Sequence, residues 1–140
     1  MDRLPLTRLV DARSLIERAA PICEPETTIA EAARMMSGHR AVLVRQAEGY
    51  GIVTDADLRS RVVAAGLPPT LPVSQIMTYP ARTVDASTSV EQVLLEMLEH
   101  DIHHLPVLED ETPIGLLSDL DILDMERHRP FSLRHRIDGL

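Results

Sequence analysis

Two short stretches of the sequence share one pattern: GIVTDAD at residues 51–57 and GLLSDLD at residues 115–121. Each has a glycine, two apolar residues, a hydroxyl residue, and an aspartate three places after that hydroxyl. Upstream, the pair Thr28-Ile29 matches Ser89-Val90 at a similar distance. The chain of 140 residues therefore contains an internal repeat. A repeated supersecondary unit outweighs any single local signal when the fold is predicted.

The same order of elements is expected in both halves. An extended segment is followed by a helix, then by two apolar runs that a polar turn separates, then by a second helix. The hairpins are expected at residues 41–53 and 103–117, and the final helices start at residues 55 and 119. The pattern predicts an α/β (α+β) fold with two β-α-β-β-α repeats. Because neither repeat buries its helices alone, we expect them to pack together about a pseudo-twofold axis.

Capping residues mark where the first helix of each half begins. Thr28 and Ser89 are typical N-cap residues, and Glu31 and Gln92 stand three places on as capping-box partners. The predicted organisation is an N-terminal arm at residues 1–19, a first repeat at 20–68, a second repeat at 69–126 and a basic tail or linker at 127–140.

The repeated phrase itself has two interpretations. Thr54 with Asp57, and Ser118 with Asp121, have the spacing of a helix capping box, which implies no ligand. The same geometry also suits a nucleotide, because a helix N-terminus and a hydroxyl attract phosphate. A carboxylate accepts two hydrogen bonds from a ribose diol. The residues alone leave both interpretations open.

The element order, the stretch IHHLPVLEDETPIGLLSDLDIL (102–123) and the connector PVSQIMTYPARTV (72–84) resemble a tandem pair of CBS (cystathionine-β-synthase-type) domains. The resemblance covers about residues 8–126. It implies a regulatory, ligand-sensing module that binds adenine nucleotides or related adenosyl ligands in clefts between the repeats and passes on a conformational change.

The resemblance also implies which residues touch the ligand. Thr54, Asp57, Ser118 and Asp121 would carry the ribose and phosphate contacts. The residues expected to flank the base are Ile22, Thr83, His104, Leu105 and Pro106.

Three positions depart from the family pattern. Many nucleotide-binding members have a basic residue just before the motif aspartate, where this chain has Ala56 and Leu120. Leu43 stands where the second half has Pro106, so the first half is the less typical one. We therefore expect AMP, ADP or an adenosyl compound as the regulatory ligand in preference to ATP, and no required cofactor.

The tail RHRPFSLRHRIDGL (127–140) is similar to the connector that follows CBS pairs in bacterial proteins with a nucleotidyltransferase-like domain. This second resemblance implies an attached enzymatic domain in a longer chain.

Self-association is expected as well. Apolar residues such as Val62, Val63, Ile122 and Leu123 lie on the final helices, which face outward and favour a homodimer. The alternative function is a structural dimerisation module that binds no ligand.

Composition excludes several other classes. The formal net charge is −8, so most of the surface would repel nucleic acid. The longest apolar run, residues 62–67, is too short to span a membrane. A single cysteine, Cys23, forms no internal disulfide, which fits a soluble cytoplasmic protein.

Catalytic and metal sites are not expected. The sequence has no nucleophile-elbow glycine pair, P-loop or HExxH motif. His100, His103 and His104 are close in sequence, but the first ends a helix and the other two point to opposite faces of a strand. Three such side chains do not converge on one ion.

Overall fold

The structure, a computed structural model, describes residues 10–127. The described chain forms two compact units. The first-repeat unit comprises residues 19–82, and the second-repeat unit comprises residues 10–18 together with 83–127. The start of the predicted arm and the predicted tail from residue 128 onward lie outside the described residues.

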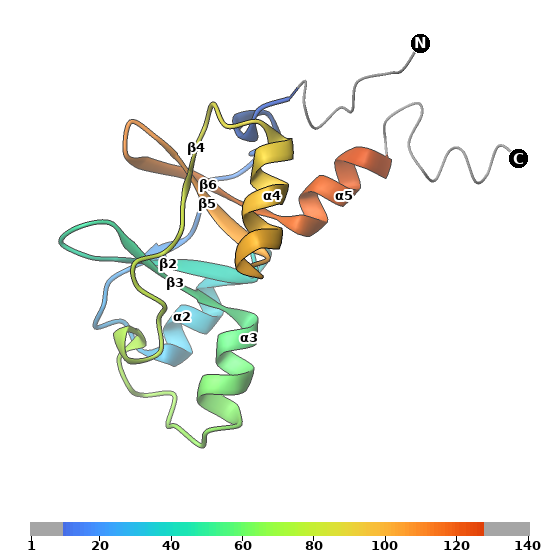
Figure 1. Ribbon diagram of the computed structural model, residues 1–140. Helices are drawn as coiled ribbons and strands as arrows, with labels where there is room; N and C mark the ends of the chain where they lie inside the picture. The colour runs from blue at the N-terminus through green and yellow to red at the C-terminus, as the bar shows by residue number, and fades with distance from the viewer. Residues whose placement is uncertain (1–9, 128–140) are drawn as a thin grey trace, which may run out of the picture. The chain divides into compact units, whose positions relative to one another are not determined.

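The first-repeat unit is a three-stranded sheet with helices packed against it (Figure 1). In chain order its elements are β1 (Ile22–Cys23), α2 (Ile29–Met35), β2 (Ala41–Arg45), β3 (Tyr50–Thr54), α3 (Asp55–Asp57), the π-helix η2 (Leu58–Val63) and the 3₁₀-helix η3 (Val73–Gln75). β1 runs parallel to β2, and β2 runs antiparallel to β3. The buried core joins the sheet to α2, η2 and η3 through Ile29, Val42, Val53, Val62 and Val73.

The second-repeat unit has the same sheet. Its elements are the 3₁₀-helix η1 (Ala12–Leu15), β4 (Val84–Asp85), α4 (Val90–His100), β5 (His104–Glu109), β6 (Thr112–Ser118) and α5 (Asp119–Arg127). β4 is parallel to β5, and β5 is antiparallel to β6. The buried core includes Ala12, Val93, Leu105, Leu117 and Ile122. The predicted α+β class and the order of elements are confirmed in both repeats. Their packing about a pseudo-twofold axis stays a prediction.

Both predicted N-caps of the first helices are present. The Thr28 side chain accepts a hydrogen bond from the backbone N–H of Glu31, and the Ser89 side chain accepts one from that of Gln92. The Glu31 carboxylate itself pairs with Arg34 at 2.6 Å.

The helix predicted from residue 55 changes type after one turn. Beyond α3 the hydrogen bonds run five residues back, as from Ala64 N to Arg59 O at 2.9 Å. Ser60 Oγ donates to the carbonyl of Ala56 at 2.5 Å, and such back-bonding takes up a carbonyl of the helix ladder. The helix therefore widens into η2, whereas α5 in the other repeat is a regular α-helix.

The segments that precede the two repeats have the same local structure. Ala12 in η1 and Val73 in η3 are both fully buried. Ala12 N donates to Thr88 O at 2.7 Å, and Val73 N donates to Thr27 O at 2.7 Å. Each segment thus docks on the turn before α4 or α2 of its own unit. The unit boundary accordingly falls after residue 82, because the connector at 69–82 packs with the first repeat.

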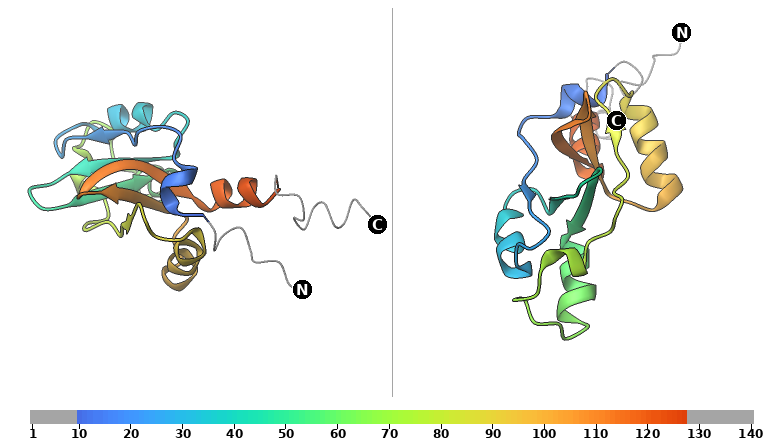
Figure 2. Two further views of the ribbon diagram at one scale, coloured as in Figure 1. Left: turned by 90° about the horizontal axis from the view of Figure 1, so that it is seen from above. Right: turned by 90° about the vertical axis from the view of Figure 1, so that its left-hand side faces the viewer.

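Close packing explains the glycine that opens each repeated phrase. A Cβ on Gly115 would lie 2.5 Å from Ile16 Cγ2 and 3.0 Å from the Arg18 carbonyl oxygen. A Cβ on Gly51 would lie 2.5 Å from Met77 Sδ. Figure 2 shows η1 beside the β5–β6 hairpin; Ile16, which contacts Gly115, directly follows η1. Glycine lets a neighbouring segment lie directly on the strand.

We expect Gly115→Ala to lower the free energy of unfolding by about 1–3 kcal/mol, because the added methyl meets a β-branched side chain and backbone. Gly51→Ala is the matched control. It meets the flexible side chain of Met77, which moves aside more cheaply. Denaturant unfolding of both variants checks the difference, and equal losses would contradict it.

Candidate functional site

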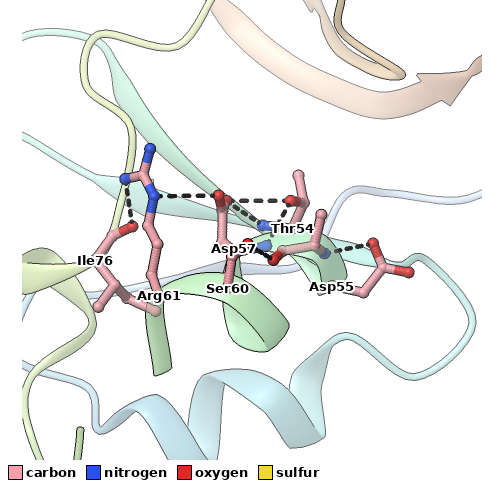
Figure 3. Close-up of polar contacts among 7 residues, drawn as sticks. Thr54, Asp55, Asp57, Ser60, Arg61 and Ile76 are labelled. Carbon is pink, nitrogen blue, oxygen red and sulfur yellow. Dashed lines mark hydrogen bonds and ion pairs between the residues drawn. The ribbon is translucent and has the colours of Figure 1, made fainter. Parts of the chain in front are cut away.

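The first motif lies where β3 passes into α3 (Figure 3). Thr54 N donates to Asp57 Oδ2 at 2.8 Å, and Asp57 N donates to Thr54 Oγ1 at 3.3 Å. Thr54 Oγ1 also donates to Asp57 Oδ2 at 3.1 Å. The two residues form a reciprocal capping box, so one of the two sequence interpretations describes a real feature of this junction.

The second motif repeats this geometry between β6 and α5. Ser118 N donates to Asp121 Oδ2 at 2.8 Å, and Asp121 N donates to Ser118 Oγ at 3.2 Å. Each motif aspartate thus uses Oδ2 to hold its helix start. Oδ1 is the oxygen that remains for another partner.

The two aspartates differ in what surrounds Oδ1. Arg61 Nε lies 3.5 Å from Asp57 Oδ1, and Arg61 Nη1 donates to the carbonyl of Ile76 at 3.1 Å (Figure 3). The Asp57 side chain is only 17% exposed. In the second repeat, Met125 stands four residues after Asp121, and Asp121 is exposed. The i,i+4 spacing of Asp57 and Arg61 is the sequence signal for this ion pair.

The residues predicted to flank the base lie on, or directly before, the first two strands of each sheet. In the second-repeat unit, His104 is the cross-strand partner of Ser118, and exposed Thr83 directly precedes β4. Pro106 is buried in β5, two residues after His104. In the first-repeat unit, half-buried Ile22 pairs with Leu43 in β2.

Leu105 differs from the other predicted contacts. Its side chain is fully buried and belongs to the core of the second-repeat unit. Alternation along β5 places it on the face opposite to that of His104. The side chain of Leu105 therefore belongs to the core of this unit.

A histidine beside α5 is a further feature that sequence reasoning missed. His103 Nδ1 lies 2.8 Å from Asp119 Oδ2, and the Asp119 N–H donates to His103 O at 3.1 Å. The hydrogen bond to Asp119, together with its negative charge, raises the pKa of the His103 imidazole above its ordinary value. Asp101 adds to the rise, and slight desolvation opposes it.

This pair predicts a pH dependence whose sign follows from the raised pKa. The stabilisation is fully present below about pH 6.5, the ordinary pKa of histidine, and disappears as the pH rises through the folded-state pKa. Its size is a few tenths of a kcal/mol at most, because His103 is 67% exposed. An NMR titration should show the pKa of His103 falling in Asp119→Asn and changing much less in Asp101→Asn. An unchanged pKa in Asp119→Asn would contradict the assignment.

Within the described part of the chain, the other histidines form no metal-binding group. His100 pairs with Glu96 at 3.6 Å. Within residues 10–127, no group of three or more histidine, cysteine, aspartate or glutamate side chains is placed to hold a metal ion. In the same part of the chain, no helix has the length and apolar character needed to cross a membrane.

The two similar halves of the chain match two copies of one known domain. The family model for the CBS domain matches residues 12–64 and again residues 73–128. This chain belongs to the CBS-domain family. CBS domains are regulatory modules that commonly bind adenosine-containing ligands.

Related CBS proteins vary in length. YhcV of Bacillus subtilis, a CBS domain-containing protein, is 31% identical over 106 residues, which cover 72% of this chain and 76% of YhcV. CBSCBSPB2 of Arabidopsis thaliana is 39% identical over 97 residues, covering 65% of this chain. The match spans only 18% of the length of that CBS protein.

A solved structure of the same family has a closely similar fold. The hexameric CBS-CP12 protein from bloom-forming cyanobacteria matches with a TM-score of 0.76 and 26% identity, over 93% of this chain and 77% of that one.

Proposed function

We propose that this CBS pair is a regulatory module that binds an adenosine-containing ligand of the AMP or ADP type. The observation that carries the proposal is the junction at Ser118 and Asp121. There the carboxylate holds the helix start through one oxygen while the residue stays exposed. The second oxygen is available to accept hydrogen bonds from a ribose diol.

The phosphate contact would come from the start of α5. Backbone N–H groups of a first helical turn attract anions, and the Ser118 hydroxyl lies at the same place. Ala56 and Leu120 bring no positive charge next to the motif aspartates. With a chain charge of −8, a triphosphate without magnesium gains less than a monophosphate or diphosphate does. The negative charge of the chain therefore favours AMP or ADP over ATP.

Thermal unfolding followed by circular dichroism tests the proposal, since the chain has no tryptophan for fluorescence. AMP, ADP, ATP, cyclic AMP, adenosine and S-adenosylmethionine are compared at equal concentration. A ligand at about one hundred times its Kd should add roughly 2.7 kcal/mol of stability, which is several degrees for a chain of this size. A larger shift with ATP than with AMP at low magnesium would refute the ligand preference.

The complete capping boxes favour a second candidate function. Because both repeated phrases already satisfy their helix starts, a structural dimerisation module needs no ligand to explain them. This candidate predicts no thermal shift with any of the six compounds.

We also propose that the chain forms a homodimer through its outward helix faces. Val63 in η2 and Leu123 in α5 are 77% and 58% exposed, whereas Val62 and Ile122, also predicted to face outward, are buried in their own cores. Sedimentation at tens of micromolar is expected to show a dimer. A monomer there would remove this part of the proposal.

The regulated activity would belong to another domain. We propose no catalysis by this chain itself, and we propose an attached enzymatic domain, nucleotidyltransferase-like by the resemblance of residues 127–140, as its partner.

A further inference from the structure

The two motif aspartates, Asp57 and Asp121, cap their helices in the same way. The surroundings of their Oδ1 oxygens differ. The distances from the capping N–H to Oδ2 are 2.8 Å in both repeats. The difference begins one helical turn later, where Arg61 in η2 corresponds to Met125 in α5. Among the residues that the structure describes, the chain therefore contains its own comparison of an aspartate with an arginine neighbour and one without.

Arg61 connects Asp57 to the connector that precedes the second repeat. Its Nε lies 3.5 Å from Asp57 Oδ1 while its Nη1 donates to Ile76 O at 3.1 Å (Figure 3). Ile76 is 2% exposed and directly follows η3, so its carbonyl is a well-anchored acceptor. The guanidinium is thus held at both ends, although the side chain is 50% exposed.

A ribose diol and Arg61 would compete for the same oxygen of Asp57. Oδ2 of Asp57 already accepts from Thr54 N and Thr54 Oγ1. A diol would need Oδ1, where a guanidinium competes as a charged donor. Within residues 10–127, the Asp121 carboxylate is bonded only through Oδ2, so a diol meets no such competitor there.

We propose that Arg61 is a specificity-determining residue that makes the first motif the weaker ligand site and links its occupation to the connector. This inference rests on the proposed function. A ligand that hydrogen-bonds to Asp57 Oδ1 displaces Arg61 from this carboxylate. The displacement also alters the hydrogen bond from Arg61 to the carbonyl of Ile76. The second motif binds without this step.

An AMP titration of the full chain, followed through backbone amide NMR signals, tests the inference. The Asp57 and Asp121 amides report the two sites separately. In Arg61→Met, which copies the second repeat, AMP should bind the first site about two- to fivefold more tightly, the range expected when a half-exposed ion pair is removed. Binding at Asp121 should not change.

Arg59→Met is the matched control, since it removes the same charge two residues away at an exposed position. It should leave both affinities unchanged. In the wild type the Ile76 and Met77 amides should shift together with that of Asp57, and in Arg61→Met this linked shift should disappear although AMP still binds.

The possible outcomes distinguish a failure of the inference about Arg61 from a failure of the proposed function. Equal tightening in Arg59→Met and Arg61→Met would overturn the inference, because general charge would then explain it. No change in Arg61→Met while AMP binds both sites would also overturn it and leave the proposed function standing. No AMP-dependent shift at either aspartate would refute the proposed function and the inference with it.

Discussion

Leu105→Ala is expected to lower the free energy of unfolding by about 3 kcal/mol, within the usual range of 2–5 kcal/mol for a buried leucine. Leu105 is fully buried in the second-repeat unit. On β5 it pairs with Leu117 of β6, and both belong to one core cluster. Truncation removes apolar contacts and leaves a cavity between the sheet and its helices, which a three-stranded sheet closes only partly.

Leu98→Ala is the control for this prediction. Leu98 lies on α4 and is 77% exposed, so the same chemical change should alter stability by less than about 0.5 kcal/mol. Urea unfolding of both variants, with the slopes compared, gives the two values. If Leu105→Ala costs no more than Leu98→Ala, the assignment of Leu105 to the core is wrong.

Asp121→Asn is expected to weaken AMP binding by roughly 10- to 100-fold, the usual cost of losing hydrogen bonds to a charged group. Asparagine keeps one oxygen to accept from Ser118 N–H, so the helix cap is largely retained. It loses the charge and the second acceptor that a ribose diol requires. Calorimetric titration with AMP measures the affinity, and circular dichroism confirms the fold.

Two variants complete this test. Asp101→Asn removes one charge at an exposed residue with a φ of 51°, a backbone conformation that asparagine tolerates, and it should bind AMP as the wild type does. Asp57→Asn should weaken total binding less than Asp121→Asn, because the Arg61 guanidinium already lies 3.5 Å from Asp57 Oδ1. Unchanged affinity in Asp121→Asn would assign the phrase GLLSDLD to helix capping alone.

The capping contacts of the candidate site could be predicted because they are local. Thr54 with Asp57, and Ser118 with Asp121, are three residues apart, and that spacing alone brings a hydroxyl and a carboxylate together at a helix start. The contact between His103 and Asp119 could not be predicted in this way. It joins residues 16 positions apart, and strand pairing decides whether they meet.

The role of Leu105 shows the same limit. A resemblance carries a position along a strand, but the sheet decides which face of that strand meets the core. Here the Leu105 side chain is buried in the core, whereas the neighbouring His104 lies opposite Ser118 in the sheet.

The sequence by itself determined the repeat, the order of elements and the helix caps, because these follow from periodicity and from contacts within a few residues. Only the tertiary structure decided that the segment at 10–18 packs with the second repeat and the connector at 69–82 with the first. It also decided that Ile16 and Met77 cover the two motif glycines and that Arg61 reaches Ile76. These contacts join residues far apart in the chain, and the packing of whole segments selects them.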